Sequence, residues 1–338
     1  MKNFYKKTFE ISSFENLVVS VFVIGYKNIG ESILVLFRDT SNDMVIMSVL
    51  IDSYERDGLN IIKDVLSKYH VDKLDFVCWT HPHCDHSPGI DSIIKEMFHD
   101  NIVIFSPKFY YGNLTEDLLA SESAKTPEIF ENIWNLIKNH PNIADIWRTI
   151  SAHGDMTHSY PIQLLAKDGV YHKDIYLYFL TPLSHKIDRF ATQGNQFRMP
   201  NELSVSFIMS VDGYDFFFGG DIENGHANGI CDDIVSEMRW IKVPHHCSIG
   251  ARSIAERLGP RFDYAASTVF KSANLPKKEI QDTYAEAGTL HMTQLDENGD
   301  YKPSHDYGII QYDYHFSPYE TKVDIITYGN AGQYFMKT

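Results

Sequence analysis

The chain is predicted to be an α/β protein, and three features of its 338 residues indicate this. Short runs rich in Val, Ile, Leu and Phe recur along the chain, as expected of buried strands. Segments with apolar residues at helical spacing lie between many of these runs. Hydrophobic residues make up 43% and charged residues 22%, as in ordinary globular proteins. We therefore expect one domain over residues 1–338, with two β-rich halves and helices outside.

Residues 1–110 alternate between strand and helix patterns. Asn28-Ile29-Gly30 indicates a turn between the first two strands. Gly58 precedes apolar residues at positions 61, 62, 65, 66 and 69, a spacing that predicts a helix. The expected strands are 17–25, 33–37, 44–51, 75–79 and 101–106, and the expected helices are 61–69 and 90–98.

The middle of the chain, about 108–172, differs in character, and we expect a mostly helical insertion or lid there. Thr126-Pro127 is typical of a helix start, with Thr as the cap and Pro at the first helical position. Apolar residues at 129, 130, 133, 134 and 137 then share one face until Pro141. Core packing or a lid explains this stripe better than a cofactor site does.

After this segment the strand pattern returns, with helices between and after the strands. The expected strands are 175–180, 204–210, 216–218, 240–243 and 264–267, and the expected helices are 232–238, 251–257 and 278–287.

Charge and composition argue against several classes of protein. Thirty Lys and Arg against 45 Asp and Glu give a net charge of −15, so a broad basic surface for nucleic acid is not expected. The longest apolar run is far too short to span a bilayer, and no signal peptide is evident. We therefore expect a soluble cytoplasmic protein without a membrane partner. The four cysteines form no CxxC pair, and disulfides are not expected.

The strongest chemical signal is the loop Thr80-His81-Pro82-His83-Cys84-Asp85-His86, directly after an expected buried strand. Three histidines and one aspartate fall within six residues. Imidazole and carboxylate groups are common ligands of Zn²⁺ and similar cations. In an extended loop, His81 and His83 project to the same side and can chelate one ion. Asp85 and His86 lie past the bend, where they can face a second ion.

Two later strand ends offer further ligands. The apolar run at 216–218 ends in Gly219-Gly220-Asp221, where the glycines leave room for close approach and the carboxylate is suited to bridging two metals. Lys242-Val243-Pro244-His245-His246 is again a strand followed by adjacent histidines.

Together these motifs resemble the metallo-β-lactamase superfamily, and more narrowly the ComEC-like group, named after a DNA-uptake protein. The likeness covers about residues 17–314, less the middle insertion. It implies a four-layer αββα sandwich that holds two divalent ions, Zn²⁺ by default and Mn²⁺ as the alternative. Further segments resemble those of the ComEC-like group and follow one another in the same order along the chain. They are Gly30-Glu31-Ser32-Ile33-Leu34, Leu50-Ile51-Asp52, Asn201-Glu202-Leu203-Ser204-Val205, and the closing hairpin Met292-Thr293-Gln294-Leu295-Asp296-Glu297-Asn298-Gly299.

The resemblance also implies individual roles. Asp52 matches an aspartate that supports the metal site from behind its ligands. The last ligand is His245 or His246; the family pattern favours His246, which would leave His245 free to donate a proton to a leaving group. The residues that match the remaining metal ligands are His81, His83, Asp85, His86 and Asp221.

The chain departs from the wider family at two positions. Asn201 stands where the third-motif histidine is usual, as it does in the ComEC-like group, so one metal site is expected to be weaker or to use water. Cys247 stands where that group has Gly, and we interpret it as a small buried residue rather than a soft ligand. Four histidines could substitute for the missing ligand, although ordinary polar roles are favoured for each: His153, His158, His172 and His185.

The implied activity is hydrolysis by a metal-activated hydroxide, with Asp85 as the group that holds the water and accepts its proton. The first hypothesis is a phosphodiesterase or nuclease acting on DNA or RNA, with a local basic rim beside the site. One alternative is a hydrolase of a small phosphodiester, a phosphocholine-type ester or a lactone. Another alternative is an inactive metal-binding module in a larger complex. Binding to a protein partner or to a second copy of the chain is also possible. The rim candidates are Lys186, Arg189, Arg198, Arg239, Lys242 and Arg252.

Overall fold

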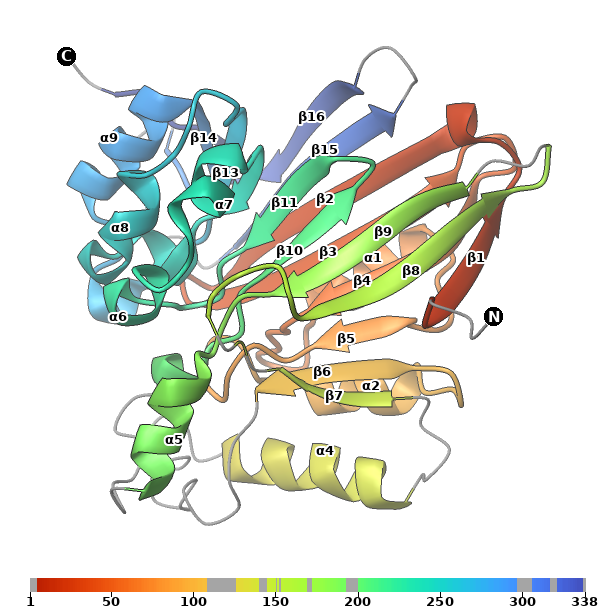
Figure 1. Cartoon of the computed structure of the whole chain (residues 1–338), viewed down its shortest axis with the longest axis horizontal. Helices are drawn as coiled ribbons and strands as arrows, with labels where there is room; N and C mark the ends of the chain where they lie inside the picture. Colours follow the sequence, from red (N-terminus) through yellow and green to blue (C-terminus); the bar gives the residue numbers. More distant parts are fainter. Residues whose placement is uncertain are drawn as a thin grey trace.

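Two mixed β-sheets pack face to face in the computed structural model (Figure 1). Sheet A has nine strands in the order β1-β8-β9-β10-β11-β12-β13-β14-β17, and sheet B has eight in the order β16-β15-β2-β3-β4-β5-β6-β7. The structure describes residues 5–107, 126–139, 145–149, 151, 153–168, 172–192, 200–296, 306–316 and 321–336.

Sheet B changes from antiparallel to parallel at its centre. Strands β16, β15, β2, β3 and β4 pair antiparallel, and β4, β5, β6 and β7 pair parallel. The bounds are β2 (Leu17–Tyr26), β3 (Gly30–Asp39), β4 (Met44–Ile51), β5 (Phe76–Cys78), β6 (Val103–Pro107), β7 (Asp145–Thr149), β15 (Tyr307–Phe316) and β16 (Thr321–Gly329).

Sheet A also changes from antiparallel to parallel strand pairing. Strands β8, β9, β10 and β11 pair antiparallel, and β11, β12, β13 and β14 pair parallel. The bounds are β1 (Lys7–Ile11), β8 (Ser159–Ala166), β9 (His172–Phe179), β10 (Phe207–Val211), β11 (Tyr214–Phe218), β12 (Trp240–Lys242), β13 (Tyr264–Ser267), β14 (Thr289–Met292) and β17 (Gly332–Gln333).

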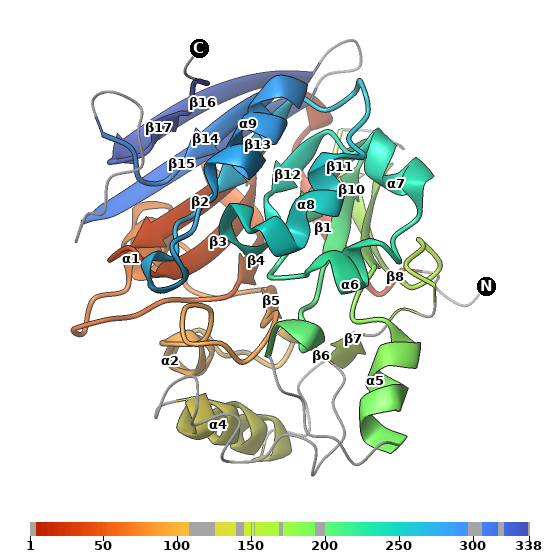
Figure 2. The same ribbon diagram turned by 90° about the vertical axis from the view of Figure 1, so that its left-hand side faces the viewer.

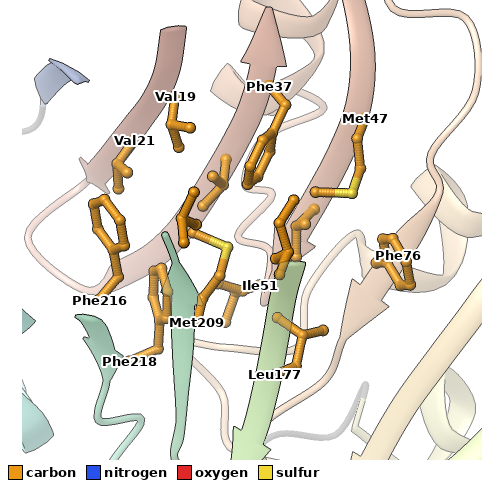
Figure 3. Packing of buried hydrophobic residues seen from close by; sticks show 14 of the residues in the cluster. Val19, Val21, Phe37, Met47, Ile51, Phe76, Leu177, Met209, Phe216 and Phe218 are labelled. Carbon is orange, nitrogen blue, oxygen red and sulfur yellow. The ribbon is translucent and has the colours of Figure 1, made fainter. Parts of the chain in front are cut away.

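The main core lies between the sheets because alternate residues of each strand face inward. Val19 and Val21 from β2 lie near Phe216 and Phe218 from β11 in this layer (Figure 3). The same cluster takes in Met209 and other side chains of both sheets, nearly all of them below 10% exposed. This buried layer holds the two sheets in fixed relative positions.

Helices cover both outer faces (Figures 1 and 2). A second apolar cluster joins sheet B to α1, α2 and α4, and a third joins sheet A to helices α6 to α9. The sequence prediction of an α/β fold with two β-rich halves and helices outside them is confirmed for the described residues. The bounds are α1 (Ile61–Lys68), α2 (Ile90–Glu96), α4 (Thr126–Asn139), α5 (Ser184–Thr192), α6 (Asn224–Ala227), α7 (Asp232–Glu237), α8 (Arg252–Ala255) and α9 (Lys278–Ala287).

The middle segment 108–172 differs from the expected helical insertion. Its described residues hold one helix, α4, but also strand β7 in sheet B and strand β8 in sheet A. Ile129 and Ile133 of α4 are buried beside α2, and Asn132 donates to Asp91 at 2.8 Å. The described part of the apolar stripe, Ile129 and Ile133, therefore packs in the core on sheet B. Among the described residues, no helix is long and apolar enough to cross a membrane.

The buried His291 of β14 predicts a pH-dependent stability. It is 4% exposed, its Nδ1 lies 2.9 Å from the Tyr312 hydroxyl, and burial lowers its pKa from 6.5 to about 4. Because the unfolded chain binds this proton more readily, the contribution is complete above pH ~6.5 and is lost as pH falls toward ~4. His291→Gln should remove up to about 3 kcal/mol of this pH dependence, measured by urea unfolding at several pH values. Parallel profiles for the two proteins would contradict this assignment.

Candidate metal centre

The sequence-predicted ligands meet where the carboxyl ends of strands from both sheets converge. Asp52 follows β4 and the loop at 80–86 follows β5, which are parallel neighbours in sheet B. Asp221 follows β11, and His246 follows the parallel strand β12 in sheet A. Parallel strands bring their carboxyl ends to one edge, which is where open α/β sheets bind ligands. The Val205 amide donates to the Thr80 carbonyl at 3.0 Å and so joins the two sheets at this edge.

The backbone at these strand ends takes unusual conformations. His245, His246 and Cys247 have φ angles of 45°, 50° and 59°, all in the left-handed region that non-glycine residues avoid. Gly220 has φ of 52°, and a Cβ there would lie 2.4 Å from the Ser204 Oγ. Such strain persists only where surrounding structure enforces it, and it gathers at functional sites. His246, in this strained segment, contacts Asp85 of the loop that follows β5, and His245 lies beside Asp221.

Ligand-type atoms form overlapping groups in which all donor atoms lie within 4.8 Å of one another. The largest group contains Asp85, His86, Asp221 and His246, all buried. A second contains His81, His83 and Asp221, also buried, so Asp221 belongs to both. A third adds the half-buried Cys84 to His83 and Asp85. The sequence interpretation had not considered Cys84 as a ligand.

His81 and His86 lie from the carboxylates at the spacing of metal ligands, whereas His246 Nε2 is hydrogen-bonded to Asp85 Oδ2 at 2.9 Å. His86 Nε2 lies 3.3 Å from Asp221 Oδ1 and 3.5 Å from Asp85 Oδ2, and His81 Nε2 lies 3.7 Å from Asp221 Oδ2. Two donors at tetrahedral angles around Zn²⁺, each ~2.0–2.2 Å away, are separated by about 3.4 Å. His81 Nε2, His86 Nε2 and both Asp221 oxygens are buried without a hydrogen bond to the described residues. The donor set therefore fits a divalent cation.

The protonation states also suit metal binding. Burial acts to raise the pKa of Asp221, but the charges of His86, His246 and His245 outweigh it and hold that pKa well below its usual range. Burial lowers the pKa of His81 well below its usual range, which leaves this imidazole neutral. Burial opposes a charge on His86, yet Asp85, Asp221 and Asp52 together raise its pKa well above the usual range. Two ionised carboxylates are thus held beside imidazoles, and a metal would replace the His86 proton.

Asp52 orients two of these histidines from behind. Its Oδ2 accepts hydrogen bonds from His86 Nδ1 at 2.7 Å and from the Thr80 hydroxyl at 2.6 Å. The Thr80 oxygen in turn lies 2.9 Å from His81 Nδ1. With Nδ1 engaged in this way, the Nε2 atoms of His81 and His86 face the cluster. Asp52 therefore contacts His86 directly and His81 through Thr80.

His245 occupies a different place from His246. Its Nε2 lies 4.0 Å from Asp221 Oδ2 and 3.3 Å from Asn201 Nδ2, and its Nδ1 lies 3.2 Å from Glu223 Oε1. Burial acts to lower its pKa, but Asp221 and Glu223 outweigh this and raise it. His245 therefore lies beside the group formed by His81, His83 and Asp221. Glu223, which holds it, was not identified from the sequence.

The remaining sequence candidates lie outside the ligand groups among the described residues. Asn201 contacts His245 instead, and Cys247 is fully buried in the apolar cluster of sheet A. Burial raises the Cys247 pKa to about 12, so this residue is a protonated thiol. None of the four substitute histidines joins a group within the described residues: His153, His158, His172 and His185.

Three cations of the expected basic rim are engaged in ion pairs. Lys242 is fully buried and pairs with Glu31 at 2.7 Å. Arg239 pairs with Asp263 at 2.7 Å, and Arg252 pairs with Glu279 at 2.9 Å. The Arg189 side chain and Arg198 lie outside the described residues, and Lys186 is half-buried.

No protein-family model matches this chain, and a search of curated proteins found no match. The feature that bears on function is the buried cluster of histidines and aspartates, which could hold a divalent metal.

Metal addition should stabilise the protein. A ligand that binds only the folded chain at 100 times its dissociation constant adds about 2.7 kcal/mol to the unfolding free energy. We expect Zn²⁺ or Mn²⁺ to raise the thermal midpoint by a few degrees, and a chelator to reverse this. Asp221→Asn should abolish the shift because Asp221 belongs to both ligand groups. Asp233→Asn, on the exposed surface of α7, is the matched control. A wild-type midpoint that no divalent metal changes would contradict a metal centre here.

Proposed function

We propose that this chain is a metal-dependent hydrolase of the metallo-β-lactamase superfamily, with its active site at the cluster of histidines and aspartates. The observation that carries the proposal is the spacing of the buried His81 and His86 Nε2 atoms from carboxylate oxygens, 3.3–3.7 Å, where the two sheets meet. The four-layer arrangement and the motif order support the family assignment. The ComEC-like group is the proposed subgroup because its motifs occur in the same order along this chain.

Each residue has a role in this proposal. His81, His83 and Asp221 would hold one divalent ion, and the group around His86 and His246 would hold the other. Bound divalent ions lower the pKa of water toward ~7 and neutralise charge on a phosphate or carbonyl group. Asp85, whose pKa lies well below its usual range because neighbouring histidines outweigh its burial, would orient the attacking water.

His245 would donate a proton to the leaving group. Its Nδ1 lies 3.2 Å from Glu223 Oε1, and its Nε2 is directed toward the Asp221 side of the cluster, 4.0 Å from Asp221 Oδ2. The charges of Asp221 and Glu223 outweigh burial and raise the pKa of this imidazole, which favours the protonated form that a general acid requires.

Two substrate classes remain. The motif likeness favours a phosphodiester bond in DNA or RNA. The net charge of −15 and the ion pairs that engage Arg239, Arg252 and Lys242 favour a small phosphodiester or another small ester. A nuclease reaction would need cationic groups along the path of the phosphate backbone.

Substrate assays decide between these classes. Labelled single- and double-stranded DNA and RNA are incubated with Mn²⁺ or Zn²⁺, in parallel with a chromogenic phosphodiester and chelated controls. We expect metal-dependent hydrolysis of at least one of them. Asp85→Asn should slow it by about 10²–10⁴-fold, the range for loss of a general base. Asp233→Ala, on the surface of α7, should retain full activity.

The outcomes separate the hypotheses. Cleavage of nucleic acid supports a nuclease, and cleavage of the chromogenic ester alone supports a small-ester hydrolase. Full metal content without turnover on any ester would favour an inactive module that acts with a partner. An Asp85→Asn variant as active as the wild type would refute the proposed mechanism.

His245→Gln tests the general-acid role. A poor leaving group needs a proton and a good one does not, so hydrolysis of an alkyl ester should slow by ~10²–10⁴-fold while a nitrophenyl ester changes little. Metal content should equal that of the wild type. Loss of one metal equivalent would instead identify His245 as the replacement for the absent third-motif histidine.

A further inference from the structure

Glu31 is a buried acid to which the proposed mechanism gives no role. It lies at the start of β3, it is 1% exposed, and its carboxylate pairs with Lys242 Nζ at 2.7 Å. Its backbone amide donates to the Asp85 carbonyl at 3.0 Å, so it also touches the loop that carries the ligands. A carboxylate in such a position needs close partners, because an isolated buried charge is costly.

The second partner of Glu31 leads to His246. The Thr268 hydroxyl, after strand β13, donates a hydrogen bond to Glu31 Oε2. The Thr268 oxygen lies 2.7 Å from His246 Nδ1. A hydroxyl has one proton to donate, and here the carboxylate takes it. The Thr268 oxygen therefore accepts from His246 Nδ1–H. The His246 Nε2 faces both carboxylates, 2.9 Å from Asp85 Oδ2 and 3.7 Å from Asp221 Oδ1, where a bound cation would replace the proton that it shares with Asp85.

The same arrangement occurs in the opposite sheet. Asp52 accepts from the Thr80 hydroxyl, and the Thr80 oxygen lies 2.9 Å from His81 Nδ1. Each threonine follows a parallel strand, β5 in sheet B and β13 in sheet A. Both carboxylates are about 1% exposed. A carboxylate, a threonine and a histidine in the same order on both sides of the cluster indicate a positioning role rather than chance packing.

We propose that Glu31 and Thr268 are positioning residues for His246. They hold its imidazole as the Nδ1–H tautomer and present Nε2 to a divalent cation shared with Asp85, His86 and Asp221. Lys242 balances the Glu31 charge. The proposal rests on the proposed metal centre, and the experiment below separates failure of one from failure of the other.

Thr268→Val removes the hydroxyl and leaves the side-chain volume nearly unchanged. We expect one of two metal equivalents to bind about 10–100-fold more weakly, measured by chelator competition with Zn²⁺ and by Co²⁺ absorption spectra. Thr268→Ser should restore the affinity. In ¹⁵N spectra, His246 should lose its single Nδ1–H tautomer in the valine variant alone. Thr181→Val is the matched control, because this buried hydroxyl bonds to Ser204 and Ser206 and contacts no ligand histidine.

A second variant tests Glu31 without leaving an unpaired buried charge that could unfold the protein. Glu31→Gln alone would leave Lys242 buried without its counter-charge, so it is combined with Lys242→Met, which removes both charges together. The double variant should fold and should show the same loss of one metal equivalent as Thr268→Val.

The controls make the outcomes distinct. A wild-type protein that binds neither Zn²⁺ nor Co²⁺ would overturn the metal centre itself. Two tight equivalents in the wild type, with unchanged affinity and an unchanged His246 tautomer in Thr268→Val and in the double variant, would overturn only the role of Glu31 and Thr268.

Discussion

Asp85 and Asp221 are two carboxylates buried side by side, and like charges in a protein interior stay ionised only when cations and hydrogen-bond donors surround them. His86 and His246 supply part of that compensation, because each places Nε2 within 3.7 Å of both carboxylates. A divalent ion bound there would supply the remaining positive charge, so that the histidines would not need to be protonated. The arrangement at this edge follows from this requirement: carboxylates and threonines behind the histidines, and strained backbone that turns the rings inward.

Meeting that requirement takes two sheets. Sheet B contributes Asp52 and the ligand loop, and sheet A contributes Asp221 and His246, so neither sheet alone contains the cluster. The apolar layer between the sheets fixes their separation, and the contact of Val205 with Thr80 fixes their register at the edge. We infer that the consecutive positive φ angles at 245–247 are sustained by this packing, since strained backbone persists only where its surroundings determine it.

Sequence patterns predicted the elements whose apolar residues are continuous or periodic, such as β4 and α9, almost to the residue. They did not predict β15, because the buried Gln311 and Asp313 interrupt its run of apolar residues. They did not predict β8 either, because Pro161 is unfavourable inside a strand. The loop at 80–86 was found because its ligands are close in sequence. Glu31 and Thr268 are separated by 237 positions and meet only through folding, so no spacing indicates their contact.

The two ligand groups differ in a way that bears on catalysis. The group around His86 has four protein donors, whereas His81, His83 and Asp221 provide three. Structural metal sites are usually closed by four protein ligands, and catalytic sites keep one position open. Asn201 stands where the resemblance expects another histidine, and it contacts His245 rather than the cluster. In the proposed enzyme, the missing ligand would therefore leave the open position beside the one imidazole that is held ready to donate a proton. The three-donor group of that enzyme would thus offer the open position for the substrate, and the four-donor group, which contains Asp85, would hold the second ion.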